Sequence, residues 1–570
     1  MPLAMTKKAK DAKAVATVRR TPGKRAGWSL LHALPGHVLV ALAALWRWLG
    51  PPRNETLLPY VRSRRVGRLG RTAIVLLTIV FCFVYGFAFG LFAPYLIGLF
   101  FIPPVIMVLL VIWALPDVKR APIDLLEGLF LAFVLTMLLW PNYLAMSIPG
   151  LPRITFLRLV GTPMAVCLMV CISTSPIFRE QLSAALKNSR LLWRTILLFA
   201  SIQTISIVFS TEKGASINIY FNMLLSWYAV FFISSYIFSK RGMAQRFAFV
   251  IWGTAVALGL LGLWENHLQA LPWAGHIPSF LKINDPIVEK ILAGTSRGGG
   301  RHRVQGPFTT SLAMAEYLAL TMPFLLHFMV GRFQPWVRFA SVATIPLVVT
   351  ATVLCQARTG LLGLAIAFIA FPMALAVLYA RRYRHSMLAW MTLYLSPLAA
   401  FLAIVVALLI PAIRIRLLGG GAEQYSTNAR YQQWHMGMPK ILAHPWGYGV
   451  GRGGETVGYL TPEGFPSIDS YPLRLVVEYG VIGIAVYYAY ALAALFYVGR
   501  NTWKGDPDHN HATLYIACGV CVLAFTAMQI NFAQEDNQSV MFIVYGMIVG
   551  LQFVGRRATA GAPAVARSSH

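Results

Sequence analysis

The feature that most constrains this chain is a series of apolar segments that recurs from residue 72 almost to the C-terminus. A helix needs about 20 apolar residues to cross roughly 30 Å of hydrocarbon, and a backbone inside lipid must satisfy its own hydrogen bonds. By this measure the candidate spans are 72–92, 96–115, 123–140, 156–173, 191–209, 216–238, 246–264, 310–330, 337–355, 360–380, 387–411, 473–497, 512–530 and 538–554. The pattern predicts an all-α, polytopic integral membrane protein with about 14 transmembrane helices, a count of 12 to 14 fitting the sequence.

Composition supports this class. Only 12% of the residues are charged and 57% are hydrophobic, whereas soluble domains carry about 25% charged residues. The net charge of +29 comes from 49 Lys and Arg against 20 Asp and Glu. In a membrane protein, basic cytoplasmic loops beside anionic lipid explain such an excess, so we expect the lipid bilayer as a partner and no nucleic acid.

The basic residues also predict the orientation. Seven loops or tails are basic if the N-terminus is cytoplasmic, so both termini are expected inside. Residues 27–50 are apolar but interrupted, and a span there would place the following arginines outside, so we expect an interfacial amphipathic helix. The predicted domains are the basic tail with that helix (1–71), N-terminal spans (72–264), an extracytoplasmic basic loop (265–309), central spans (310–411), a large helical extracytoplasmic loop (412–472), C-terminal spans (473–555) and a cytoplasmic tail (556–570).

Loops rich in Lys and Arg usually stay in the cytoplasm, which is the positive-inside rule. Several arginines break it because the predicted topology places them on the outer side. Positive charge held there has no lipid field to stabilise it, and the planar guanidinium suits bidentate contact with phosphate or carboxylate. These outward residues are Arg297, Arg301, Arg303, Arg358, Arg414, Arg416 and Arg430, with Arg153 and Arg158 as a lesser case. The sequence shows no cluster with metal-ligand spacing and no DxD pattern, so neither a metal nor another cofactor is expected.

The longest polar insert between apolar segments runs from Arg414 to Gly483. It contains a polar helix with Arg430, a turn at 444–451 rich in glycine, and Asp469-Ser470 just before a new apolar run. A polar insert of this size that faces out is a candidate active site.

Structural interpretations of these residues remain open. The 297–303 segment could equally be a solvated loop, and Arg430 could belong to an ordinary amphipathic face. Glu316 lies between apolar residues within a span and needs a partner, which structural pairing or function could supply. Histidines 435 and 444 are interpreted as structural.

Four elements in order over residues 303–483 resemble the O-antigen ligase/polymerase superfamily of bacterial envelope glycosyltransferases. The spacing of the ligase motif is kept: nine residues separate Asp469-Ser470 from Gly480, and two more separate Gly480 from Gly483. Asp469 stands where the motif has His. The segment from Ala429-Arg430 to Gly451 is similar to the R-x3-W and HPxxGxG block. Two shorter matches are Gln356–Gly360, similar to S-R-G, and Arg303–Phe308, similar to R-x2-G-x-F.

The resemblance implies metal-independent transfer of a glycan from undecaprenyl pyrophosphate to an acceptor sugar hydroxyl. It implies that Arg358 and Arg430, with Arg303 and Arg301, hold the pyrophosphate, and that Asp469 acts as general base. Further candidate residues are Arg297, Arg414, Arg416, Ser470 and Glu478, the last an acid that burial could instead keep neutral. The implied location is the bacterial inner membrane, with the active site on the periplasmic side.

Asp469 favours a polymerase that joins undecaprenyl-pyrophosphate-linked repeat units into exopolysaccharide or O-antigen. A ligase that moves a finished glycan to lipid A core or protein is the first alternative. A lipid-linked glycan transporter or flippase is the second, although the sequence shows neither mid-span charges nor paired broken helices. The expected partners are the lipid-linked glycan and an acceptor glycan, with a flippase and a chain-length regulator as candidates.

Overall fold

The computed structural model describes residues 76–77, 79–86, 102–118, 121–146, 153–281, 286–294, 296–297, 301–411, 414, 424–461, 464–504, 510–531 and 533–560. The predicted interfacial helix over 27–50 and Arg416 lie outside these residues. The first predicted span, 72–92, is described in part and is helical at 76–77 and 79–86.

The predicted all-α, polytopic fold is confirmed. Among the described residues, ten helices are long and apolar enough to cross a membrane. They are α5 (Phe156–Thr174), α7 (Arg190–Ser206) continuing into η2 (Ile207–Phe209), α8 (Lys213–Met223) continuing through the π-helical η3 (Leu224–Ala229) into α9 (Val230–Ile237), α10 (Met243–Leu268), α12 (Ser311–Val330), α13 (Pro335–Leu354), α14 (Arg358–Arg382), α19 (Tyr471–Lys504), α20 (Asn510–Gln529) and α21 (Gln538–Ala560). Three further helices fall on predicted spans: α3 (Ile102–Trp113), α4 (Ile123–Leu139) and α15 (Met387–Leu409).

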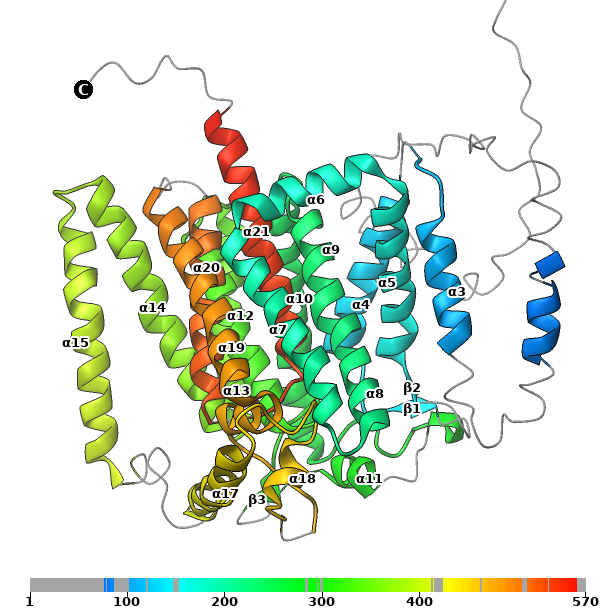
Figure 1. Ribbon diagram of the computed structural model, residues 1–570. Coiled ribbons are helices and arrows are strands. Elements are labelled where there is room, and N and C mark those ends of the chain that lie inside the picture. The colour runs from blue at the N-terminus through cyan, green and yellow to red at the C-terminus, as the bar shows by residue number, and fades with distance from the viewer. Residues whose placement is uncertain are drawn as a thin grey trace, which may run out of the picture. The chain divides into compact units, whose positions relative to one another are not determined.

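The remaining elements connect these helices. They are the helices α6 (Pro176–Asn188), η4 (Ser279–Leu281), α11 (Pro286–Ala293), α17 (Gln424–Ala443) and α18 (Gly453–Val457). Two antiparallel hairpins join β1 (Ala145–Met146) to β2 (Ile154–Thr155) and β3 (Ser296–Arg297) to β4 (Arg301–His302). Figure 1 shows α6 at one end of the bundle, and α11, α17, α18 and both hairpins at the opposite end. The positive-inside rule predicts that this second end is extracytoplasmic.

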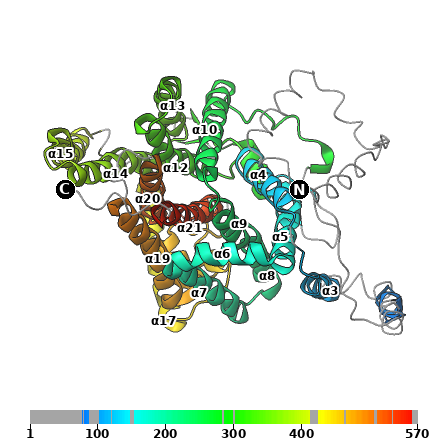
Figure 2. The same ribbon diagram turned by 90° about the horizontal axis from the view of Figure 1, so that it is seen from above.

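The centre of the bundle consists of α12, α20 and α21, which neighbouring helices surround in Figure 2. Nearly every residue of α12 from Ser311 to Phe328 is buried, as expected for a helix that is apolar on all sides. Helices α13 and α15 instead expose large apolar side chains such as Phe339 and Leu388. In a bilayer these side chains would face lipid.

Helix α19 is interrupted at Gly480, which has φ 71° and ψ −175°. The turn that follows α17 fills this break. The backbone N–H groups of Tyr448 and Gly449 donate to the carbonyls of Val477 and Glu478, at 2.9 and 3.0 Å. The N–H of Val481 donates to Pro445 O at 3.0 Å. The turn therefore satisfies backbone groups that the broken helix cannot satisfy within itself.

We expect Gly480→Ala to destabilise the protein. Its backbone conformation is essentially restricted to glycine, so a side chain there costs about 1–3 kcal/mol in strain. A Cβ would also lie 2.2 Å from Pro445 O, so the turn must shift as well. Thermal unfolding of the purified protein in detergent should show a lower midpoint temperature for this variant.

Gly499→Ala is the matched control in the same helix, because a Cβ at Gly499 meets nothing within 4 Å. Equal midpoints for the two variants would contradict the role assigned to the break.

Candidate active site

Asp469 and Arg430 are held on adjoining surfaces. Gln433 of α17 is fully buried and its Oε1 accepts a hydrogen bond from the backbone N–H of Asp469 at 2.8 Å. Arg430 precedes Gln433 by three residues, so the two side chains lie on the same face of the helix. The half-buried carboxylate of Asp469 receives a long contact from Ser467 Oγ at 3.4 Å. The polar loop thus holds the backbone of Asp469 against Gln433, about one helical turn along α17 from Arg430.

Ser470 follows Asp469 and attaches the start of α19 to the α20–α21 connection. Its buried hydroxyl donates to the carbonyl of Ile530 at 3.3 Å. This contact gives Ser470 a structural part in fixing the position of its neighbour Asp469.

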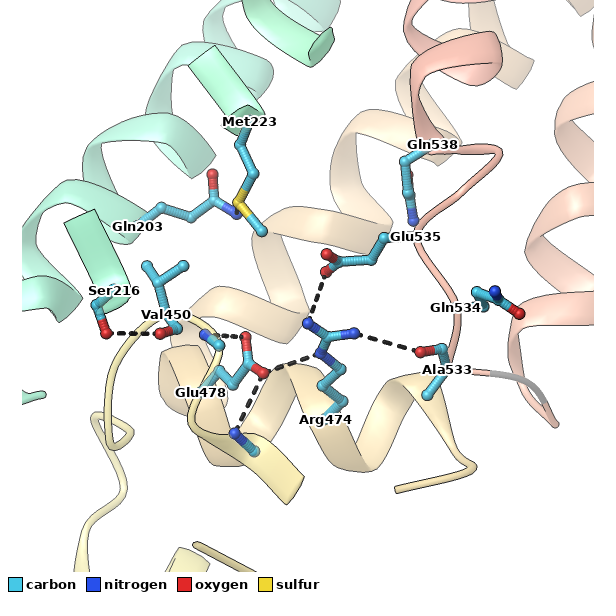
Figure 3. A network of polar contacts seen from close by, with 12 residues as sticks. Gln203, Ser216, Met223, Val450, Arg474, Glu478, Ala533, Gln534, Glu535 and Gln538 are labelled. Carbon is cyan, nitrogen blue, oxygen red and sulfur yellow. Dashed lines mark hydrogen bonds and ion pairs between the residues drawn. The ribbon is translucent and has the colours of Figure 1, made fainter. Parts of the chain in front are cut away.

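An ion-pair network one turn into α19 continues this attachment (Figure 3). Arg474 lies 2.9 Å from Glu478 Oε1 through Nε and 3.2 Å from Glu535 Oε1 through Nη2. Its Nη1 donates to Ala533 O at 3.3 Å. One guanidinium therefore joins α19 to the connection before α21. The sequence prediction did not include Arg474, although opposite charges at i and i+4 were a signal for this pair.

Glu478 is committed to the scaffold. Besides Arg474, its carboxylate accepts hydrogen bonds from the backbone N–H groups of Gly451 at 3.0 Å and Gly453 at 3.2 Å. The side chain is 1% exposed. A carboxylate with three donors holds the glycine-rich turn against α19 and has little capacity left to accept a substrate proton.

The α20–α21 connection also binds the start of α12. Asp536 accepts from Thr309 through Oγ1 at 2.5 Å and through the backbone N–H at 3.4 Å. Further along, Asn537 Nδ2 and Gln529 Nε2 donate to the Glu316 carboxylate at 2.8 and 3.2 Å. Glu316 thus has structural partners inside the bundle. The connection links the Asp469 side of the site to the segment that precedes α12.

Arg303 lies in that segment, against the residues before α14. Its Nε donates to Cys355 O at 3.2 Å and its Nη2 to Gln356 O at 3.4 Å. Arg358 is the first residue of α14, so Arg303 lies close to the start of the helix that carries Arg358. A helix N-terminus is the positive end of its dipole, which adds to these charges.

A buried carboxylate from α10 fixes this segment. Glu265 accepts from His302 Nε2 at 2.8 Å and from the backbone N–H groups of Gln305 and Gly306 at 3.0 and 2.8 Å. These contacts hold the residues on both sides of Arg303. Sequence analysis did not identify this role of Glu265, since its partners lie 37 to 41 residues further along the chain.

The structure ties the other predicted residues less directly to Asp469 and Arg358. Arg297 and Arg301 are Cα partners across the β3–β4 hairpin, one residue before His302. Arg414 is exposed, and no contact in the described part of the chain ties it to Asp469. Among the described residues, no group of three or more His, Cys, Asp or Glu side chains could hold a metal ion.

We expect Arg474→Ala to lower stability strongly. Removing one partner of a buried ion pair costs about 3–5 kcal/mol, because it leaves uncompensated charge. Here both Glu478 and Glu535 lose their guanidinium. The unfolding midpoint should fall, whereas Arg500→Ala, an exposed arginine in the same helix, should leave it unchanged. A wild-type midpoint for Arg474→Ala would refute the anchoring role.

Glu535 should make stability depend on pH. Burial raises the pKa of its carboxyl to about 7, against the opposing effect of Arg474, and Glu478 and Asp536 raise it further. The ordinary value is about 4.3, so the folded state binds more protons than the unfolded state between about pH 4.3 and 7. The contribution of this group to stability therefore declines as pH rises through that window. The midpoint temperature of thermal unfolding, measured from pH 5 to 8, should fall less with rising pH in Glu535→Gln than in the wild type. An equal fall in both proteins would contradict this.

A family model described as O-Antigen ligase matches residues 342–488, which include α14, α17, α18 and the break in α19. No curated protein matches the chain. Arg358, Arg430 and Asp469 all fall within the matched range, which implies a glycosyltransferase-like membrane enzyme. The predicted resemblance is confirmed over this range: residues 342–488 match the O-antigen ligase family model, which supports a likeness to O-antigen ligase/polymerase-like proteins.

Proposed function

We propose that this protein polymerises undecaprenyl-pyrophosphate-linked oligosaccharide repeat units into exopolysaccharide or O-antigen, without a metal, at the periplasmic face of the bacterial inner membrane. The observation that carries the proposal is the placement of Asp469. Its backbone is held by Gln433, on the face of α17 that also carries Arg430. A carboxylate beside arginines at one end of a membrane bundle suits proton abstraction next to an anionic leaving group.

The proposed reaction needs two functions from these residues. Arg358 and Arg303, with Arg430 and Arg301, bind the pyrophosphate of the donor and stabilise the charge that grows on it. Asp469 accepts the proton of the acceptor hydroxyl as its oxygen attacks the anomeric carbon. The bond between that carbon and the pyrophosphate oxygen breaks, and undecaprenyl pyrophosphate leaves with the electron pair. Arg297, Arg414 and Arg416 would contribute through long-range attraction.

Glu478 does not take the base role in this mechanism. Its carboxylate already accepts from Arg474, Gly451 and Gly453. Asp469 receives only the 3.4 Å contact from Ser467 on its side chain among the hydrogen bonds of the described residues. The contrast supports Asp469 as the residue that faces the acceptor.

A ligase that transfers finished glycan to lipid A core or protein is the second candidate, favoured by the description of the matching family as O-Antigen ligase. The two activities differ in the material that accumulates in a deletion strain. Loss of a polymerase leaves single lipid-linked repeat units, whereas loss of a ligase leaves long lipid-linked polymer. The lipid-linked glycan profile decides between them.

The broken helix in α19 bears on the transporter alternative. Transporters use pairs of broken helices whose open ends contact substrate. In α19 the open backbone groups at Gly480 are occupied by the 445–449 turn. This occupation favours a structural role for the break over a transport site.

We expect Asp469→Asn, Arg358→Ala and Arg430→Ala to abolish polymer formation while the protein still inserts in the membrane. A missing general base costs about 10²–10⁴-fold in rate, enough to remove long polymer. The glycan profile of a complemented deletion strain gives the readout.

Arg382→Ala is the control for Arg358→Ala, since this exposed arginine lies at the other end of the same helix. It should restore wild-type polymer. Wild-type chain length from the Asp469→Asn strain would exclude Asp469 as the base.

A further inference from the structure

A second basic region contributes to neither the pyrophosphate site nor the base. A cavity of about 630 Å³ lies between the end of α4, the start of α5, α8, η3 and α11. Arg153 and Arg158 line it, together with Asn142, Asn218 and Asn222. Its volume is within the range of small-molecule sites, about 300–1,000 Å³.

Arg158 is held in place by neutral oxygen atoms. Its Nε donates to Asn222 Oδ1 at 2.8 Å, its Nη2 to Asn218 Oδ1 at 2.9 Å and its Nη1 to Arg153 O at 2.8 Å. No acidic side chain is among the described residues that line the cavity. The positive charge of Arg158 is therefore positioned without being neutralised at the cavity wall.

The number of remaining donors indicates the size of the anion. A guanidinium has five N–H groups, and three of those of Arg158 are engaged. Two donors are the number that one carboxylate takes in a bidentate contact. The two remaining donors of Arg158 therefore match one carboxylate.

The rest of the wall suits a sugar. Asn142 donates through Nδ2 to Met137 O at 3.0 Å, while its buried Oδ1 has no hydrogen-bond partner among the described residues. A buried acceptor without a partner is unfavourable, so a ligand hydroxyl that donates to it would be stabilised. Apolar side chains such as Phe133 and Leu157 form much of the remaining surface. Amides beside apolar and aromatic groups can bind both the hydroxyls and the apolar face of a sugar ring.

The π-helical segment η3 is part of the same wall. Leu225 and Ser226, both in η3, line the cavity. A π turn inside a transmembrane helix is unusual and occurs frequently at functional sites. The cavity therefore coincides with an irregular segment of the helix.

We propose that this cavity binds a carboxylate-bearing saccharide unit of the acceptor glycan, with Arg158 on the carboxylate and Asn142 on a hydroxyl. The proposal rests on the glycan transfer proposed above and adds the class of substrate. Thr309 connects the cavity to the active site: it lines the cavity and binds Asp536 in the α20–α21 connection. Through that connection the cavity is linked to Arg474 and the start of α19, where Asp469 lies.

Isothermal titration calorimetry with the purified full-length protein tests the proposed saccharide site. The probes are trigalacturonate, which is acidic, maltotriose, which is neutral, and inorganic pyrophosphate, which reports on the donor site. We expect trigalacturonate to bind more tightly than maltotriose. Arg158→Gln should weaken trigalacturonate binding by at least about tenfold, because it removes the charge-assisted hydrogen bonds to the carboxylate. Arg358→Ala should leave trigalacturonate binding unchanged and weaken pyrophosphate binding.

Arg158→Gln could also disturb the contact between α5 and α8, so a second variant keeps the arginine. Ser226→Leu places a larger apolar side chain in the cavity wall and should also block trigalacturonate. Absence of trigalacturonate binding to the wild type, normal binding to Ser226→Leu, or an equal loss of pyrophosphate binding in Arg158→Gln would each overturn the proposal. These outcomes are separate from the polymer profile of the Arg358→Ala strain, which tests the proposed function.

Discussion

The Glu478 carboxylate makes the contacts on which the arrangement of α19, the glycine-rich turn and the α20–α21 connection depends. It pairs with Arg474 and accepts from the N–H groups of Gly451 and Gly453, so one buried group joins α19 to the glycine-rich turn. Arg474 extends the network to Glu535, and the same connection holds Thr309 before α12. Buried charge costs free energy unless it is fully paired, which ties the arrangement to a single geometry. The network positions the start of α19, next to Asp469, whereas Arg303 is held separately by the contacts of Glu265 with its neighbours.

The spans could be predicted from the sequence because the constraint is local. A hydrophobic run must match the bilayer, and its ends are marked by polar residues: 156–173 was predicted where α5 covers Phe156–Thr174, and 310–330 where α12 covers Ser311–Val330. The amphipathic α6 was missed because a helix of 13 residues with charged positions reads as a basic loop. The break in α19 was missed for another reason. Gly480 lies in an apolar run, and only a turn about 30 residues earlier in the chain fills the gap.

The candidate site was predictable in part for the same reasons. The positive-inside rule predicts which arginines face out, and motif spacing singles out Asp469; both stay predictions. The roles of the acids could not be separated, since Glu478 and Asp469 differ in their neighbours rather than in their own chemistry. The α20–α21 connection carried no motif at all. Its importance comes from contacts with α12 and α19 that are distant in sequence.

The distribution of acids and arginines at this end of the bundle has a consequence for substrate binding. The acids Glu265, Glu478 and Asp536 bind backbone N–H groups or side chains of the scaffold. They fix loops and the break in α19, and so they are not available to neutralise every arginine. Arg158 shows the result most clearly, because its guanidinium donates to neutral oxygens among the described residues. An anionic substrate would then neutralise the arginines that have no acidic partner. The same acids that hold the loops in place therefore favour binding of negatively charged substrates over neutral ones.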